Sequence, residues 1–291
     1  MLIFYLYRIA IENHITSRFF IAILYYGVFM KDKITSINNQ NIKNIKKLLF
    51  SSRYRYKENK FIIEGARICC DAYKNGVEIL GIFCTYEAIE KYNVYLKEIL
   101  EKRNSFIISK EVMHYISDTE SPQGVFCICR MQKRNINFNS IGDKVVILEN
   151  IQDPSNLGTI VRTAEALGLN DIIMSSDCCD IYNPKVLRGS MGSIFRINHI
   201  ISNDFNILFF NLKDIGFKIF ASVPDDSVIN ISKVDFSGKI AVCIGNEGNG
   251  LKKETISLCS KKITIPMRGK SESLNASSAS TIIMWEMSKY I

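Results

Sequence analysis

Apolar strands that alternate with helices through the second half of the chain are the feature that most restricts its fold. Val/Ile-rich runs, each followed by apolar residues at helical spacing, recur between 144 and 291. Strands are predicted at 144–149, 171–175, 217–222, 239–244 and 261–265, and helices at 156–167, 184–190, 204–214, 251–259 and 275–289. This order predicts a mainly parallel sheet with helices on both faces. Ligands bind such sheets beyond the carboxyl ends of the strands.

The first half predicts a smaller α/β unit. Its expected helices are 33–49, a helix that stops at Gly76, 86–103 and one near 110–117; its strands are the run that begins at Phe61, 79–84, 106–108 and 125–130, and residues 51–60 read as a basic loop. The polar stretch 131–143 reads as a linker. We therefore expect a domain at 31–130 and a second domain at 144–291.

Residues 1–30 read as an extension of uncertain role. Charged residues interrupt the segment, and its longest clean apolar run, 19–30, has 12 residues. That run is shorter than the roughly 20 residues that a membrane span needs. We expect no membrane partner, and we expect Met30 to be the working start, because a polar, basic sequence begins there.

Positive charge is concentrated in one segment. The chain has 37 Lys and Arg against 29 Asp and Glu, a net charge of +8. Seven of these cations lie between Lys43 and Lys60, with Glu58 as the one acid. Aromatic residues alternate with the cations, a pattern that suits phosphate contact and base stacking. A solvated basic helix end with core aromatics would look the same.

Cysteine and histidine usage argues against a metal site. The nine cysteines include no Cys-x-x-Cys pair, and there are three histidines. Most of the cysteines lie in apolar runs, where free thiols act as small buried side chains. We expect reduced thiols, a cytoplasmic location and no metal.

Three motifs follow strands of the second half. The first, 148–169, holds an Asp153-Pro154-Ser155-Asn156 turn in which Ser155 or Asn156 can cap a helix that carries Arg162. By itself this motif fits an ordinary capped surface helix. Asn156 precedes Arg162 by six residues, so both side chains can face the opening of the same ligand site.

The other two motifs are a glycine loop and a serine-rich helix start. The loop 244–250, IGNEGNG, lets backbone approach a ligand closely, but its glycine order and late position differ from the dinucleotide fingerprint. The segment 265–275 leads into a helix that begins with Ala and Ser, which must pack closely to be stable. Alone, these motifs also fit a common turn and a terminal helix.

Together the three motifs closely resemble, in order and spacing, those of the SpoU (TrmH) family of RNA methyltransferases. The resemblance covers about 144–291, and SSRYRYKENKFIIEGAR resembles the ribosomal-protein-like substrate-binding domain of many members. It implies a trefoil knot that holds S-adenosylmethionine, largely through backbone groups. Carried over by motif, the cofactor positions are Gly245, Ile265 and Leu274, with Asn246, Glu247, Met267 and Ser273 lining the loops. The catalytic positions are Asn156, Arg162, Ser273 and Asn275.

The reaction implied by the resemblance is methylation of a ribose 2′-hydroxyl in RNA. A guanidinium stays protonated, so we expect Arg162 to stabilise the developing alkoxide while a phosphate or water takes the proton. Asn156 and Asn275 would orient groups, and Asn275 can equally cap the last helix. The expected RNA contacts are Lys46, Lys47, Arg53, Arg55 and Lys57. The resemblance also implies a homodimer.

Three alternatives remain open from the sequence. The extra N-terminal domain favours 23S-type ribosomal RNA as substrate over transfer RNA. A non-catalytic RNA-binding or ribosome-assembly factor could share the fold, although Asn156 and Arg162 are present. A nucleotide-dependent oxidoreductase is suggested only by the glycine loop.

Overall fold

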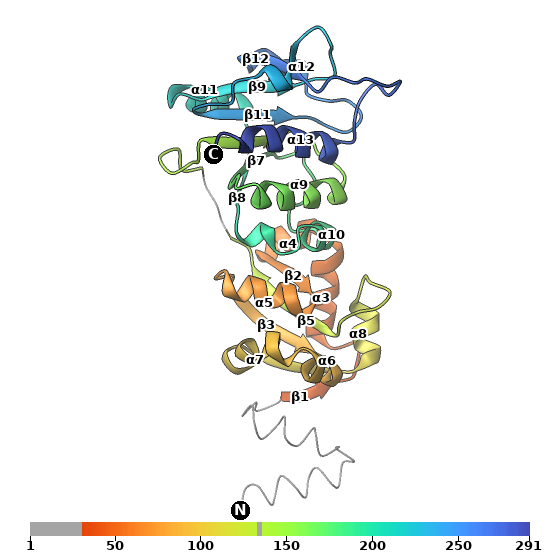
Figure 1. Ribbon diagram of the computed structural model, residues 1–291. Coiled ribbons are helices and arrows are strands. Elements are labelled where there is room, and N and C mark those ends of the chain that lie inside the picture. The colour runs from red at the N-terminus through yellow and green to blue at the C-terminus, as the bar shows by residue number, and fades with distance from the viewer. Residues whose placement is uncertain (1–30, 133–135) are drawn as a thin grey trace, which may run out of the picture. The chain divides into compact units, whose positions relative to one another are not determined.

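The computed structural model describes residues 31–132 and 136–291 of the chain (Figure 1). The expected extension 1–30 and the expected start at Met30 lie outside the described residues. The chain divides into two compact units, which meet in the sequence at Met131 and Gln132.

The first unit is a five-stranded sheet with the strand order β1-β4-β3-β5-β2. Its strands are β1 (Lys31–Ile34), β2 (Lys60–Glu64), β3 (Ile79–Cys84), β4 (Ser105–Ile108) and β5 (Val125–Arg130). Its helices are α3 (Gln40–Phe50), α4 (Ser52–Glu58), α5 (Ala66–Lys74), α6 (Tyr86–Lys91), α7 (Asn93–Lys102) and α8 (Lys110–Ile116). β5 pairs antiparallel with β2 and β3, whereas β4 pairs parallel with β1 and β3.

The beginning of this unit differs from the sequence prediction. Residues 31–34 form an edge strand beside β4 rather than the start of a helix. The helix begins at Gln40, because the Asn39 side chain accepts a hydrogen bond from the Asn41 amide and caps it. Tyr92 separates α6 from α7, where one helix was expected.

The predicted basic loop 51–60 is also wrong, since most of it is helix α4. The Ser51 hydroxyl accepts from the Tyr54 amide and caps α4, and Asn59 ends the helix in the left-handed region at φ 53°. Apolar residues are sparse on this seven-residue helix, so spacing gave no helical signal. The stabilising contact comes from a charged residue.

Arg55 attaches α4 to the end of α3. Its side chain is 3% exposed, and its Nη1 donates to the carbonyl oxygens of Leu48 and Leu49 at 2.7 and 3.1 Å. The last carbonyls of a helix lack intrahelical donors and lie at the negative end of its dipole, so a buried guanidinium suits them. Arg55 therefore stabilises the fold, and its expected role as an RNA contact is wrong.

Replacing Arg55 with alanine is expected to lower the free energy of unfolding by about 2 kcal/mol, because two buried carbonyls lose a charged donor. Urea unfolding followed by circular dichroism measures this loss. Arg53→Ala, on the exposed side of the same helix, removes an equal charge and should change stability little. Equal losses in the two variants would contradict a capping role for Arg55.

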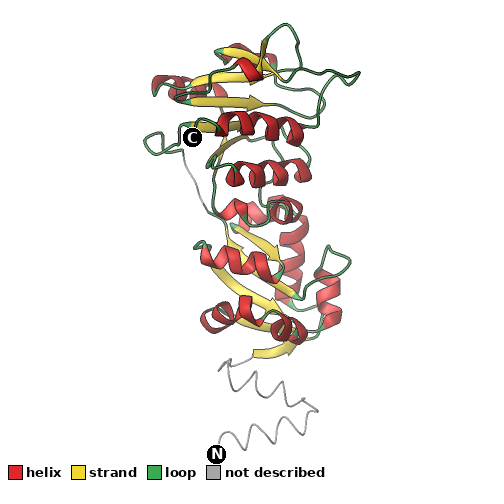
Figure 2. Ribbon diagram, in the orientation of Figure 1, coloured by secondary structure: helices red, strands yellow, loops and turns green. Residues whose placement is uncertain are grey.

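The second unit is a seven-stranded sheet with the strand order β10-β12-β9-β11-β6-β7-β8 (Figures 1 and 2). Its strands are β6 (Lys144–Leu148), β7 (Asp171–Ser175), β8 (Asn198–Ser202), β9 (Lys218–Ser222), β10 (Ile229–Asn230), β11 (Ile240–Ile244) and β12 (Lys261–Thr264). Its α-helices are α9 (Pro154–Ala166), α10 (Pro184–Gly189), α11 (Phe205–Asp214), α12 (Lys253–Leu258) and α13 (Ala276–Ser288), and two 3₁₀ turns lie at Ser193–Phe195 and Ile231–Lys233.

All pairs in this sheet are parallel, which confirms the predicted α/β class. Alternate strand residues such as Val145, Ile147 and Ala241 pack with α11. α9 and α13 lie side by side over the opposite face in Figure 1. The predicted strands and helices of this unit are confirmed, while edge strands β8 and β10 were missed. Among the residues that the structure describes, no helix is both long and apolar enough to cross a membrane.

Candidate active site

A cavity of about 600 Å³ opens where β9, β11 and β12 end. Three segments supply most of its lining: the end of β9 and the following turn at 222–226, the glycine loop 244–250 with Leu251, and the stretch 264–279 that leads into α13. The carboxyl ends of parallel strands were the expected location of a ligand. The volume falls within the range of roughly 300–1,000 Å³ that small-molecule and cofactor sites occupy.

The glycine loop is folded tightly back on itself. Asn246 and Gly250 exchange two backbone hydrogen bonds, each 3.0 Å long. A Cβ atom on Gly245 would lie 2.2 Å from the carbonyl carbon of Gly250, so no other residue fits at position 245 without moving the loop. The requirement for glycine is therefore the close approach of backbone to backbone.

The Asn246 side chain holds this loop together. Its Oδ1 accepts from the amides of Gly248 and Asn249, and its Nδ2 donates to the carbonyl oxygen of Asn150 at 2.8 Å. Asn246 lines the cavity, but its side chain is occupied by contacts within the protein. Any contact that it makes with a ligand would then use the backbone.

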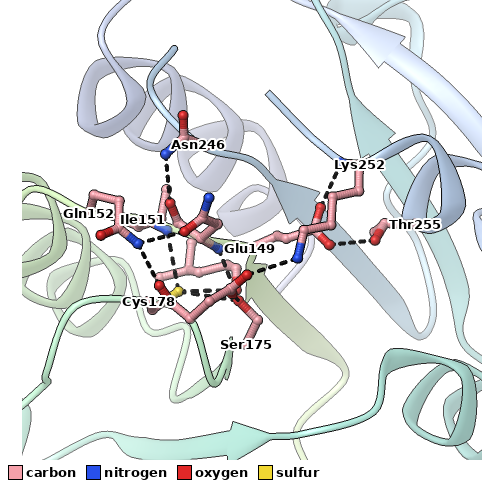
Figure 3. A network of polar contacts seen from close by, with 11 residues as sticks. Glu149, Ile151, Gln152, Ser175, Cys178, Asn246, Lys252 and Thr255 are labelled. Carbon is pink, nitrogen blue, oxygen red and sulfur yellow. Dashed lines mark hydrogen bonds and ion pairs between the residues drawn. The ribbon is translucent and has the colours of Figure 1, made fainter. Parts of the chain in front are cut away.

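A buried carboxylate supports the far end of the loop (Figure 3). Glu149 is 3% exposed and follows β6 directly. Its two oxygens accept from the backbone amide of Lys252 at 2.8 Å and from the Thr255 hydroxyl at 2.5 Å. These donors lie at the start of α12, where a negative charge is favourable. Sequence reasoning missed Glu149, although its position directly after a strand and inside the first motif was a signal.

Glu247 connects the glycine loop to the first motif. Its carboxylate accepts from Asn156 Nδ2 at 2.9 Å and from the backbone amides of Gln152 and Asp153. Burial acts to raise the pKa of Glu247, but the hydrogen bonds from Asn156 and the backbone hold that pKa below its usual value. Glu247 is therefore ionised near neutral pH and acts as an acceptor.

Ser155 or Asn156 was expected to cap α9, and this expectation is wrong. Asp153 caps the helix by accepting from the Ser155 amide, and Pro154 occupies the first turn. Asn156 lies in the first turn with 5% of its surface exposed, and its amide is directed to Glu247. This side-chain pair joins the first two motifs, in addition to the backbone contacts that Asn246 and Glu247 make with the first motif.

The third motif forms the remaining wall of the cavity. Ile265, Met267, Ser273 and Leu274 all line it, together with Gly245, Asn246 and Glu247. Asn275 is exposed and caps α13, accepting from the amides of Ser277 and Ser278, so the capping alternative is confirmed. α13 packs on α9, with Ser280 fully buried and bonded to the Ala276 carbonyl.

Arg162 does not line this cavity. It is exposed on α9, beside a separate hollow between α9 and α13 that is also lined by Thr281, Ile282 and Trp285. No described residue forms a hydrogen bond or ion pair with its guanidinium, so the group is available to an external anion. The structure brings the cofactor candidates together but leaves Arg162 on a neighbouring surface.

The basic residues of the first unit have different surroundings. Lys47, Arg53 and Lys57 are exposed. Lys46 is half-buried, with its Nζ 3.4 Å from the centre of the Tyr115 ring. These four residues keep their predicted availability to RNA, in contrast to the buried Arg55. The described parts of the chain hold no group of three or more His, Cys, Asp or Glu placed to bind a metal ion.

Comparison with known proteins agrees with both halves of the chain. The profile described as the SpoU rRNA Methylase family matches residues 143–285, and that of the MRM3-like substrate binding domain matches residues 39–127. The chain belongs to the SpoU family. The resemblance seen in the three motifs is thereby confirmed.

Similar SpoU proteins match over most of their lengths. The 23S rRNA (guanosine(2553)-2′-O)-methyltransferase RlmP of Bacillus subtilis is 28% identical over 88% of this chain and 98% of its own. The 23S rRNA (uridine(2479)-2′-O)-methyltransferase of Streptomyces viridochromogenes is 24% identical, over 87% and 91%. The AdoMet-bound rRNA methyltransferase from Sinorhizobium meliloti superposes with a TM-score of 0.78 at 26% identity, covering 89% of this chain and 98% of that one.

Proposed function

We propose that this protein transfers a methyl group from S-adenosylmethionine to a ribose 2′-hydroxyl of 23S-type ribosomal RNA. The observation that carries the proposal is the cavity at the ends of β9, β11 and β12, which gathers residues of the second and third SpoU motifs and reaches the first through Asn156 and Glu247. The similar proteins from Bacillus and Streptomyces are named as 23S rRNA 2′-O-methyltransferases. Nine unpaired cysteines are compatible with action in the reducing cytoplasm.

The residues of the cavity fit S-adenosylmethionine. Ile244, Ile265 and Leu274 offer apolar surface for an adenine ring, and the backbone of Gly245, which no Cβ covers, offers polar groups. When bound, this cofactor supplies a methyl group already activated by its sulfonium. We also propose that the loops after β11 and β12 form the trefoil knot implied by the family resemblance.

The remaining task of the chain is to orient the RNA and to assist loss of the hydroxyl proton. Glu247 and Asn156 fix the mouth of the cavity, and Ser273 lines its wall. Arg162, which stays protonated, would bind the developing alkoxide or the adjacent phosphate, while a phosphate or water takes the proton. Asn275 would position Ser273 and Leu274 by capping α13.

The direct test incubates the full chain with tritiated S-adenosylmethionine and RNA from a strain that lacks this protein. We expect label in ribosomal RNA, at a nucleotide that then resists alkaline cleavage. Label in transfer RNA alone would replace the proposed substrate. If the protein bound the cofactor but labelled neither RNA, the proposed activity would be wrong and a non-catalytic RNA-binding role would be favoured.

We further propose that two copies dimerise through the exposed face of α9 and α13. Trp285 is 56% exposed, Ile282 lies one turn away, and both adjoin the hollow that holds Arg162. Exposed apolar side chains gathered beside a hollow suit an interaction site. A second copy on this face would bring Arg162 to the subunit contact.

Replacing Trp285 with arginine is therefore expected to weaken dimerisation at least tenfold, because a buried aromatic anchor would become a charge. Analytical ultracentrifugation over a range of concentrations measures the change. Val94→Arg, at a 93% exposed site on α7, adds the same charge elsewhere and should leave the dimer intact. An unchanged dimer with Trp285→Arg would exclude this face.

A further inference from the structure

A smaller cavity lies beside the basic segment of the first unit. It has a volume of about 210 Å³ and is lined by residues of α3, α4, the start of β2, strands β3 and β5, and the start of β4. Residues 43–60, which carry the concentrated positive charge, form one side of it. No part of the methyl-transfer site described above uses this cavity.

The floor of the cavity is flat and aromatic. The rings of Phe83 and Phe106 stack with their centroids 4.7 Å apart and their planes within 11°. Gly81 lies beside them, and a Cβ there would meet Phe106 and the Asn104 carbonyl at 3.6 Å. These are ordinary van der Waals distances, so the backbone of Gly81 lies close against the aromatic pair. Because the cavity is smaller than the roughly 300 Å³ at which drug-sized sites begin, it suits a single small ring system.

Carboxamide groups surround this floor. Asn41 and Asn104 both line the cavity, and neither side-chain amide has a hydrogen-bond partner among the described residues. The Asn44 Oδ1 accepts from the Tyr54 hydroxyl at 3.4 Å, which holds Tyr54 against the opening. Carboxamides supply both donors and acceptors, the groups that read the edge of a nucleobase.

Several cations belong to the segment beside the cavity. Lys60 lines the cavity, and the Nζ of Lys47 lies 5.6 Å from the centre of the Tyr54 ring. Lys43 and Lys57 are exposed in the same segment. Glu58, the one acid of the segment, also lines the cavity, with its Oε2 4.0 Å from the Nζ of Lys60. A basic segment beside an aromatic, amide-lined hollow suits a nucleotide whose base enters while its phosphate stays outside.

We propose that this cavity binds one unpaired base of the RNA substrate. The inference rests on the proposed function only in taking RNA as the ligand. The base lies against Phe106 and Tyr54, its edge bonds to Asn41 and Asn104, and its flanking phosphates contact Lys47 and Lys60. Arg55 acts as a positioning residue here, because it fixes the helix that carries Tyr54 to the end of α3.

The test compares two fluorescein-labelled RNA probes of equal length and phosphate count, one a short oligoadenylate and the other with abasic riboses at its central positions. Fluorescence anisotropy with the full chain measures both affinities. We expect the wild-type protein to bind the oligoadenylate about tenfold more tightly. Asn41→Ala with Asn104→Ala should remove most of that preference and leave the affinity for the abasic probe unchanged.

Two further variants separate base binding from charge and folding. Gly81→Val fills the floor without changing charge and should also remove the preference, with circular dichroism confirming the fold. Lys47→Ala should lower the affinity for both probes by the same factor and make binding less dependent on salt concentration. Asn38→Ala, an exposed asparagine outside the cavity, is the control and should behave as wild type.

If the Asn41→Ala/Asn104→Ala variant and the Gly81→Val variant both preferred the oligoadenylate as strongly as the wild-type protein does, the proposal would be overturned. Equal binding of the two probes by the wild-type protein would also overturn it. The assay contains no S-adenosylmethionine and measures no methyl transfer. If ribosomal RNA became labelled in the methylation test but the protein bound both probes equally, only the base pocket would be refuted. Selective binding by a protein that transfers no methyl group would refute the proposed activity alone.

Discussion

Arg162→Ala is expected to lower the turnover number for RNA methylation by about 10²–10³-fold, the usual cost of removing a donor that stabilises an oxyanion. The guanidinium is exposed, lies beside the α9–α13 hollow, and has no partner among the described residues. It does not line the cofactor cavity, so the affinity for S-adenosylmethionine should be unchanged. Single-turnover methylation together with calorimetric cofactor binding measures both quantities.

The matched control for charge is Arg162→Lys. Lysine keeps the positive charge but cannot form two parallel hydrogen bonds to a phosphate or alkoxide, so we expect a loss intermediate between wild type and alanine. Turnover near the wild-type value in the lysine variant would exclude a bidentate contact. A large loss of cofactor affinity in the alanine variant would instead assign Arg162 to the cofactor cavity.

Central strands of the second unit were predictable because burial on both faces makes them continuous apolar runs. Ile240–Ile244 is buried at every position, and such a run has few alternative structures. Edge strands lack that signal: Asn198–Ser202 includes an exposed Ile201, and three of the four residues of Lys31–Ile34 are charged. Their pairing depends on neighbours that are distant in the sequence, which a local pattern does not report.

The site shows the same division between local and distant causes. The glycine loop and the segment before α13 were identifiable because each is a local motif. The contact of Asn156 with Glu247 joins residues 91 positions apart and appears only in the folded chain. Arg55 was misassigned for the opposite reason: a cation in a basic segment looks solvent-exposed until its burial against the α3 carbonyls is seen.

Glu149 is the clearest case of a contact beside the cavity that joins residues distant in the sequence. Its carboxylate is buried and bridges β6 to the start of α12, 103 positions later for Lys252 and 106 for Thr255. Lys252 lies two residues after Gly250, the last residue of the glycine loop, and directly follows Leu251, which also lines the cavity. The Glu149 carboxylate therefore fixes the chain just after the glycine loop, close to where Gly250 and Leu251 pack against Gly245.

Replacing Glu149 with alanine is expected to lower the free energy of unfolding by about 3 kcal/mol, because a buried amide and hydroxyl lose a charged acceptor. The freed loop should also raise the KM for S-adenosylmethionine at least tenfold, with a smaller effect on turnover once the cofactor is saturating. Urea unfolding and steady-state kinetics measure the two changes. Glu254→Ala removes an exposed carboxylate from the same helix turn and should alter neither. If both variants behaved alike, general charge at the start of α12, rather than the two bonds to Glu149, would hold the loop.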